Sequence, residues 1–107
     1  MKQGDVYWYT FPAPNKRRPV LILTRDSAIH YLTGITVAAI TSKIRGIDSE
    51  VRLSRFDGFV TECAASLDNI HTIPKAKLGP FIAHLSRERM VEVRRAIEFA
   101  LGFDAIP

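Results

Sequence analysis

The sequence lacks the cysteines that a disulfide framework or a zinc ribbon requires. Its 107 residues include one cysteine, Cys63, which excludes an internal disulfide. His30 and His84 are scattered along the chain and do not form a metal-ligand spacing with Cys63. We therefore expect no metal site and no cofactor, and a reducing compartment, the cytoplasm.

Long apolar runs are also missing. No segment approaches the roughly 18 consecutive apolar residues needed to span a bilayer, and the N-terminal MKQGDVYWYTF has no continuous apolar stretch of the signal-peptide kind. The sequence also lacks repeats, linkers and low-complexity tracts. Because a chain of this length supports one hydrophobic core, we expect one soluble, unexported domain over residues 1–107.

Acidic residues are fewer than basic ones. The chain carries 15 Lys and Arg against 11 Asp and Glu, a formal charge of +4. A mild positive charge favours polyanionic partners such as nucleic acid, but does not identify one.

Short apolar runs, separated by Pro, Gly, Asn and Asp about every ten residues, predict a small β-barrel. Runs 18–24 and 35–41 are apolar at successive positions, which indicates burial on both faces. Run 49–54 alternates and predicts Glu50, Arg52 and Ser54 on an exposed face. One helical turn is expected within 25–34. The predicted strands cover 5–11, 18–24, 35–41, 49–54, 59–68, 70–74 and 81–85.

The C-terminal segment changes to a helical period. Met90, Val93, Ile97 and Leu101 recur at helical spacing between a predicted N-cap at Ser86 and a stop at Gly102. The opposite, charged face of this helix is consistent with nucleic-acid reading or with an ordinary solvated surface.

Read together, these segments resemble the MazF/PemK family of toxin endoribonucleases from type II toxin–antitoxin systems. The matching pieces, in family order, are GDVYWYTF at 4–11, RRPVLIL at 17–23, AAIT at 38–41, EVRLS at 50–54, SLDNIHTIPKAKL at 66–78 and IAHLSRERMVEVRRAIEFALGF at 82–103. The resemblance implies a mainly β, SH3-like barrel of the CcdB/PemK type with a C-terminal helix, in a homodimer. It also implies metal-independent, sequence-selective cleavage of single-stranded mRNA, which inhibits translation and growth, and a MazE/PemI-like antitoxin with an acidic C-terminal tail.

The resemblance also assigns catalytic candidates. The Arg before the Pro of the family's RP pair, here Arg18, is expected at the scissile phosphate, where a guanidinium can donate two hydrogen bonds. Thr41, which ends AAIT, is the second candidate, although a strand-end threonine can also be purely structural. Asp68 is the third; it would orient Arg18 or accept the 2′-OH proton, or it is an ordinary turn residue.

Further residues are expected to bind RNA. The alternative for Lys16 and Arg17 is a solvated basic loop, and the alternative for His71 is an ordinary surface histidine. Trp8 is expected in the core. The segment Pro12–Lys16 is shorter than the loop often found in the family, which leaves its catalytic contribution open. The RNA-binding candidates are Lys16, Arg17, Ser42, Lys43 and His71.

Two other functions remain open at this point. A noncatalytic SH3-like module that binds nucleic acid or protein would keep the basic surface but would not bring Arg18, Thr41 and Asp68 together. A growth inhibitor that acts through protein contact would have no ribonuclease activity.

Overall fold

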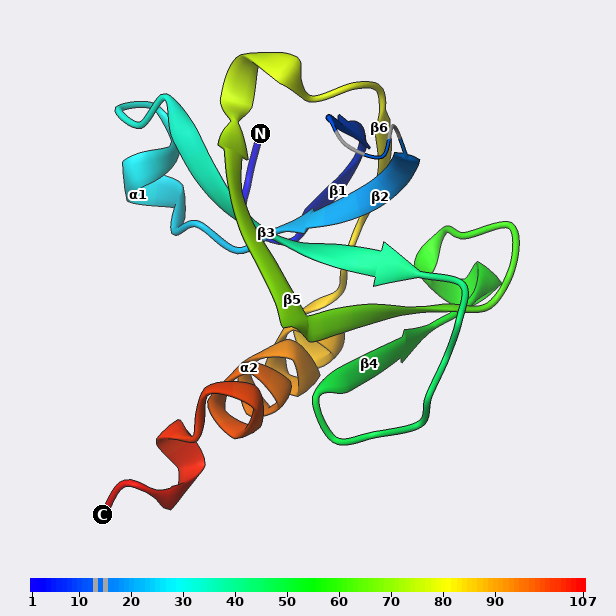
Figure 1. Cartoon of the computed structure of the whole chain (residues 1–107), viewed down its shortest axis with the longest axis vertical. Coiled ribbons are helices and arrows are strands. Elements are labelled where there is room, and N and C mark those ends of the chain that lie inside the picture. The colour runs from blue at the N-terminus through cyan, green and yellow to red at the C-terminus, as the bar shows by residue number, and fades with distance from the viewer. Residues whose placement is uncertain (13, 15) are drawn as a thin grey trace.

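The computed structural model describes residues 1–12, 14 and 16–107, and its main element is one curled antiparallel sheet (Figure 1). The order of the strands across the sheet is β4-β5-β3-β2-β1-β6. The predicted mainly β fold with a C-terminal helix is confirmed. The strands are β1 (Asp5–Phe11), β2 (Lys16–Ile22), β3 (Gly34–Thr41), β4 (Glu50–Leu53), β5 (Cys63–Pro74) and β6 (Phe81–His84).

Among the described residues, two α-helices and three short 3₁₀ helices complete the fold. The one-turn α1 covers Asp26–Ile29, and α2 covers Arg87–Leu101. The Ser86 hydroxyl caps α2 by accepting from the Arg89 amide at 3.2 Å, and Gly102 ends the helix as predicted. No helix in the described part of the chain is long and apolar enough to cross a membrane. The 3₁₀ helices are η1 (Arg55–Asp57), η2 (Lys75–Lys77) and η3 (Phe103–Ala105).

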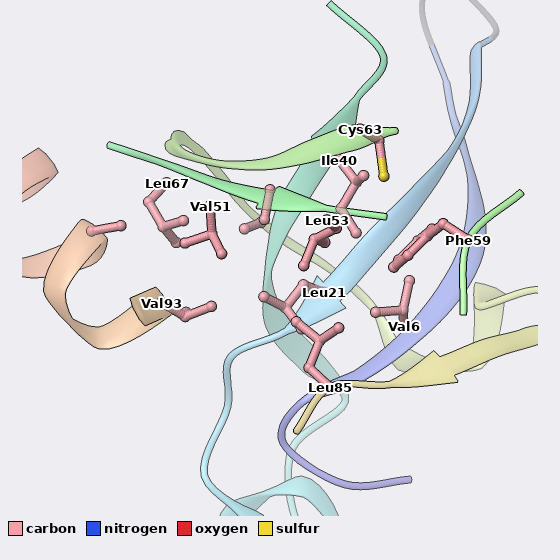
Figure 2. Packing of buried hydrophobic residues seen from close by; sticks show 13 residues of the cluster. Val6, Leu21, Ile40, Val51, Leu53, Phe59, Cys63, Leu67, Leu85 and Val93 are labelled. Atoms are coloured by element: carbon pink, nitrogen blue, oxygen red, sulfur yellow. The ribbon is translucent and has the colours of Figure 1, made fainter. Parts of the chain in front are cut away.

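One hydrophobic core lies between the sheet and α2, which packs against β4 and β5 (Figures 1 and 2). Figure 2 shows Val93 of α2 pointing toward Leu21 of β2 and toward Leu85, which follows β6. The apolar stripe predicted for the helix is thus the surface by which α2 closes this core.

A second core lies on the other side of the sheet. It contains Val20 and Ile22 of β2, Val37 of β3 and Ile73 of β5, and Ile29 of α1 packs with them. Since successive strand residues point to opposite faces, a strand with a core on each side must be apolar at every position. The predicted two-sided burial of β2 and β3 is confirmed.

The strand boundaries differ from the prediction most in β2 and β5, and the predicted strand residues 59–62 lie before β5, which begins at Cys63. β2 begins at Lys16, two residues before the predicted start, so the cations belong to the strand itself. The predicted strands 59–68 and 70–74 form one strand, β5, because a register shift opposite Ala38 and Ala39 takes up the irregular residues between them. Of the segment Pro12–Lys16, predicted to be a shortened loop, Ala13 and Asn15 lie outside the described residues.

Glu50 was expected on an exposed face, and that prediction is wrong. Its side chain is only 1% exposed, and one carboxylate oxygen accepts from the amides of Arg45 and Gly46 at 2.9 and 3.0 Å. Burial alone raises the pKa of Glu50, but these hydrogen bonds and the Arg45 guanidinium outweigh it, so the pKa lies below its usual value. Glu50 therefore holds the connection between β3 and β4.

Gly58 lies directly after η1 and packs closely on β6, so we expect Gly58→Ala to destabilise the fold more than Gly46→Ala does. Its φ of +99° lies in the left-handed region, and a Cβ there would stand 2.9 Å from the Ala83 Cβ of β6. Gly46 has φ +70° with nothing within 4 Å of its Cβ position. Gly46→Ala should cost about 1–2 kcal/mol of unfolding free energy from backbone strain alone. Gly58→Ala should cost about 1–3 kcal/mol more, because the backbone must also move.

Urea unfolding of the two variants measures this difference. Equal losses of unfolding free energy would show that residue 58 does not pack closely on β6.

Candidate active site

The main pocket, of about 620 Å³, lies where β2 and β3 leave the two cores. Three parts of the chain enclose it: the first half of β2, the end of β3 with the residues after it, and the segment after η1. Trp8, Cys63 and the start of β6 complete the walls. The lining residues are Trp8, Lys16, Arg17, Arg18, Pro19, Ile40, Thr41, Ser42, Lys43, Gly58, Phe59, Val60, Thr61, Cys63, Phe81 and Ile82.

β2 and β3 bring Arg18 and Thr41 to this pocket. The pairing of the two strands ends with Val20 opposite Ala39, and Arg18 and Thr41 each lie two residues from this pair on their own strand. Both residues line the pocket. The Thr41 hydroxyl accepts from the Lys43 amide at 3.1 Å, which leaves the hydroxyl proton available for a ligand.

The pocket is strongly basic. Lys16, Arg17, Arg18 and Lys43 line it, and none of its described lining residues is acidic. None of these four cations forms an ion pair with a described residue, that is, no carboxylate oxygen of the described part of the chain lies within 4 Å of their charged nitrogens. Their charges are not neutralised by ion pairs with the described residues, so the pocket suits a phosphate-bearing ligand.

Trp8 does not belong to either core, contrary to the prediction. It is half-buried and lines the pocket, with the Arg17 guanidinium carbon 4.2 Å from the centre of the indole ring. This cation–π contact places an aromatic surface next to the cations.

Asp68 lies outside the pocket, in the irregular part of β5. Its carboxylate accepts from the Ser49 hydroxyl and lies 3.8 Å from a guanidinium nitrogen of Arg45. The expected partner, Arg18, is not among its described partners, because the register shift turns this part of β5 toward the β3–β4 connection.

His71 also lies away from the pocket. Its Nε2 is 2.7 Å from the Asn69 side-chain oxygen, and its ring is 4.9 Å from the Phe11 ring. Of the eight sequence-predicted site residues, the structure brings Arg18, Thr41, Lys16, Arg17, Ser42 and Lys43 together and leaves Asp68 and His71 apart.

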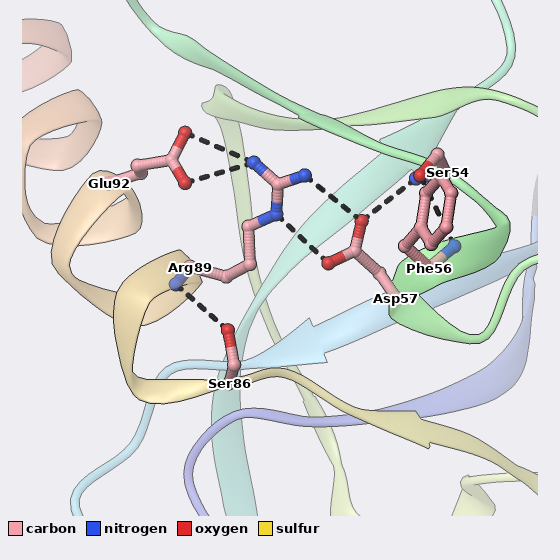
Figure 3. A network of polar contacts seen from close by, with 6 residues as sticks. All are labelled: Ser54, Phe56, Asp57, Ser86, Arg89 and Glu92. Carbon is pink, nitrogen blue, oxygen red and sulfur yellow. Dashed lines mark hydrogen bonds and ion pairs between the residues drawn. The ribbon is translucent and has the colours of Figure 1, made fainter.

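The pocket wall that follows η1 is held by a partly buried ion pair (Figure 3). The Asp57 carboxylate accepts from Arg89 of α2 at 2.9 and 3.3 Å and from the Ser54 amide at 2.9 Å. Burial alone raises the pKa of Asp57, but the Arg89 hydrogen bonds, the Ser54 amide and the Arg89 charge together place it below its usual value. The capping motif S-x-x-D at 54–57 was the available sequence signal. No sequence signal indicated that Arg89 of α2 would be the partner of Asp57.

Cys63 lines the pocket but is poorly suited to act as a nucleophile. Burial, with a smaller contribution from the Asp57 charge, raises the pKa of its thiol to about 11. A thiol is reactive as the thiolate, which is scarce at neutral pH when the pKa is this high. In the described part of the chain, no group of three or more His, Cys, Asp or Glu is placed to hold a metal ion.

Arg89→Ala should lower the unfolding free energy by about 2–4 kcal/mol at neutral pH, because it leaves the buried Asp57 charge without its partner. The Asp57 pKa is depressed in the folded state, so its stabilisation is complete above the ordinary value near 3.8 and is lost as the pH falls through the folded value. The difference in unfolding free energy between wild type and Arg89→Ala should therefore become smaller below about pH 4. Chemical denaturation across this pH range measures it.

Arg94→Ala is the matched control on the same helix. Arg94 makes an exposed pair with Glu98 at 3.8 Å and should contribute under about 0.5 kcal/mol. Similar losses for the two variants, or a loss at Arg89 that does not change with pH, would contradict the anchoring role of the Asp57–Arg89 pair.

Comparison with known proteins identifies the family. The model of the PemK-like, MazF-like toxins of type II toxin–antitoxin systems matches residues 2–101. Probable endoribonuclease MazF2 of Mycobacterium tuberculosis is 32% identical over 103 residues, covering 95% of this chain and 99% of the relative. Endoribonuclease MazF3 of the same organism is 39% identical over 90 residues, covering 84% and 87%.

A solved structure agrees with these sequence relatives. The Mycobacterium tuberculosis toxin MazF-mt6 superimposes with a TM-score of 0.84 at 35% identity, over 92% of this chain and 96% of that chain. The residues matched by the family model, 2–101, span the sheet and α2. The chain belongs to the PemK-like, MazF-like toxin family of type II toxin–antitoxin systems.

Proposed function

We propose that this chain is an endoribonuclease toxin that cleaves single-stranded RNA in the main pocket, with the 2′-hydroxyl of the RNA as the nucleophile. The observation that carries the proposal is that Arg18 and Thr41 line the same basic pocket, which has no acidic residue among its described walls. The relatives' endoribonuclease names support the same activity.

In this reaction the 2′-oxygen attacks the adjacent phosphorus and the bond from phosphorus to the 5′-oxygen breaks. The 2′-hydroxyl loses its proton and the leaving 5′-oxygen gains one, which gives a 2′,3′-cyclic phosphate and a 5′-OH end. Negative charge develops on the phosphate oxygens in the transition state. Arg18 donates to these oxygens from a guanidinium that remains charged, and the free proton of Thr41 provides a further donor.

The other pocket cations bind the neighbouring phosphates. Lys16, Arg17 and Lys43, with the Ser42 hydroxyl, line the path on either side of Arg18. Since RNA carries its own nucleophile and these cations supply the charge, the reaction needs no metal and no cofactor. Trp8 and Phe81 offer aromatic surfaces to unpaired bases, which favours a single-stranded substrate.

Asp68 and His71 act indirectly in this proposal. Asp68 fixes Ser49 and Arg45 on the β3–β4 connection, which begins with Ser42 and Lys43. Replacing Asp68 would alter activity through the position of those RNA-binding residues. His71 is a candidate for a contact with a distant part of the RNA.

The toxin acts on mRNA in the cytoplasm, where cleavage stops translation and growth. It forms a homodimer and is inhibited by a cognate antitoxin, as toxins of this family do. An acidic antitoxin tail complements the unneutralised cations of the pocket and competes with RNA for them. Exposed apolar side chains, including Phe56, Val60 and Phe81, provide surface for these contacts.

Removing the 2′-hydroxyl from the nucleotide 5′ to a mapped cut should abolish cleavage, because the nucleophile is gone. Binding should change little, since phosphates supply most of the affinity.

Arg18→Ala should lower the cleavage rate about a hundredfold or more, as expected when a donor to the transition-state charge is lost. Gel assays in excess EDTA measure both effects.

Arg25→Ala is the control, because Arg25 is exposed and lies outside the pocket. It should cleave at the wild-type rate. Normal cleavage of the 2′-deoxy substrate would mean that another group is the nucleophile. Binding of RNA without cleavage by the wild type would favour the noncatalytic SH3-like module, and no RNA interaction would favour an inhibitor that acts through protein contact.

A further inference from the structure

Residues 58–61, between η1 and β5, form one wall of the main pocket without belonging to a helix or a strand. Val60 of this 58–61 wall is 99% exposed, and Thr61 beside it is also exposed. A ligand in the pocket therefore meets an apolar side chain and a hydroxyl on this side. Because the wall lies outside the ladders of the sheet, other contacts must fix its position.

The backbone joins the 58–61 wall to η1. The Gly58 amide donates to the Arg55 carbonyl at 3.1 Å, and the Phe59 amide donates to the Ser54 carbonyl at 3.3 Å. The Phe59 side chain is buried in the core between the sheet and α2 (Figure 2). Gly58 leaves no room for a side chain, since a Cβ there would stand 2.9 Å from the Ala83 Cβ. The position of the wall therefore depends on how η1 is held.

Asp57, the last residue of η1, ties this part of the chain to α2 (Figure 3). Its side chain is 8% exposed, and its two carboxylate oxygens accept from Arg89 at 2.9 and 3.3 Å. The Arg89 guanidinium also donates to Glu92, on the same helix, at 3.0 Å. A bidentate pair of this kind fixes direction as well as distance. Beyond the other end of the wall, the exposed Arg52–Glu62 pair at 3.6 Å adds little.

We propose that Arg89 and Asp57 are positioning residues for RNA cleavage: their ion pair holds Val60 and Thr61 against the bound RNA and so sets how strictly the pocket selects a sequence. This inference rests on the proposed function. Neither Arg89 nor Asp57 lines the pocket, so both act through the 58–61 wall.

The chemistry of the 58–61 wall favours a role in selectivity. The wall carries no charged side chain, so it suits a base rather than a phosphate. A hydroxyl such as that of Thr61 can donate to or accept from the edge of an unpaired base. A displacement of about 1 Å can change a rate by about a hundredfold, so a wall that shifts when the ion pair is broken alters the relative rates for different RNAs.

The test compares competing RNAs in a single reaction. A pool randomised at the nucleotides that flank a mapped cut is partially cleaved, and sequencing of cut and uncut molecules gives the relative kcat/KM for each base. Since all RNAs meet the same enzyme, the folded fraction of a variant cancels from these ratios. Arg89→Ala and Asp57→Asn should each reduce the preference at the same position about 2- to 10-fold, the value of one hydrogen bond.

The double variant should reduce the preference no more than the larger single change, because the two residues act as one unit. Ile29→Ala is the matched control. Ile29 is buried in the second core and lies outside the pocket, so its truncation should destabilise the fold and leave the base preference unchanged. Thermal melting verifies that Ile29→Ala and Arg89→Ala are destabilised to a similar extent.

An unchanged base preference in Arg89→Ala and Asp57→Asn, or the same loss in Ile29→Ala, would overturn the positioning role, because the pair would then only stabilise the fold. A double variant whose loss equals the product of the single losses would also overturn it. So would a wild type that cleaves the pool without base preference. These results leave cleavage itself intact. A wild-type toxin that cleaves no RNA in the pool would instead remove the proposed function.

Discussion

The burial of β2 and β3 on both faces is the constraint on which the rest of the structure depends. A core on each side of these strands leaves no solvated face for a polar residue along their central parts. Polar side chains can enter only where the strands leave the cores, and Arg18 and Thr41 stand at those points on neighbouring strands. The pairing of β2 with β3 ends at Val20 and Ala39, and Arg18 and Thr41 lie just beyond it, where both line the pocket. The strands that form the two cores therefore also position the site.

Two buried carboxylates stabilise the fold, whereas the cations of the pocket remain available to a ligand. Glu50 and Asp57 are buried carboxylates that hold the segments on either side of β4, and each lies where amides and an arginine compensate its charge. The pocket cations have no such compensation among the described residues. Because the acidic groups are used to fix the walls, the positive potential of the pocket remains available to a polyanion. A rigid basic pocket stabilises transition-state charge without reorganising during the reaction.

Much of this arrangement could be predicted from the sequence, and particular residues show why the rest could not. The limits of β1 and α2 follow from local signals, namely Pro12 after the strand and the caps Ser86 and Gly102, and all were predicted as observed. Arg18 and Thr41 came from the family resemblance, which the family match confirms, although their catalytic roles remain predictions. Partners distant in sequence were missed. The turn-like Asp68 gave no sign that a register shift would direct it to Ser49 and Arg45, and nothing in the local pattern linked Asp57 to Arg89 on α2.

In the proposed reaction, the pocket orients a nucleophile supplied by the RNA itself. Mass spectrometry of both ends of the products, after brief digestion of an RNA with a mapped cut, tests this most directly because the end groups record which atom attacked phosphorus. We expect a 2′,3′-cyclic phosphate on the upstream fragment and a 5′-OH on the downstream fragment. An upstream 3′-OH with a downstream 5′-phosphate would show that water or a protein group attacked, and would rule out the 2′-hydroxyl as the nucleophile.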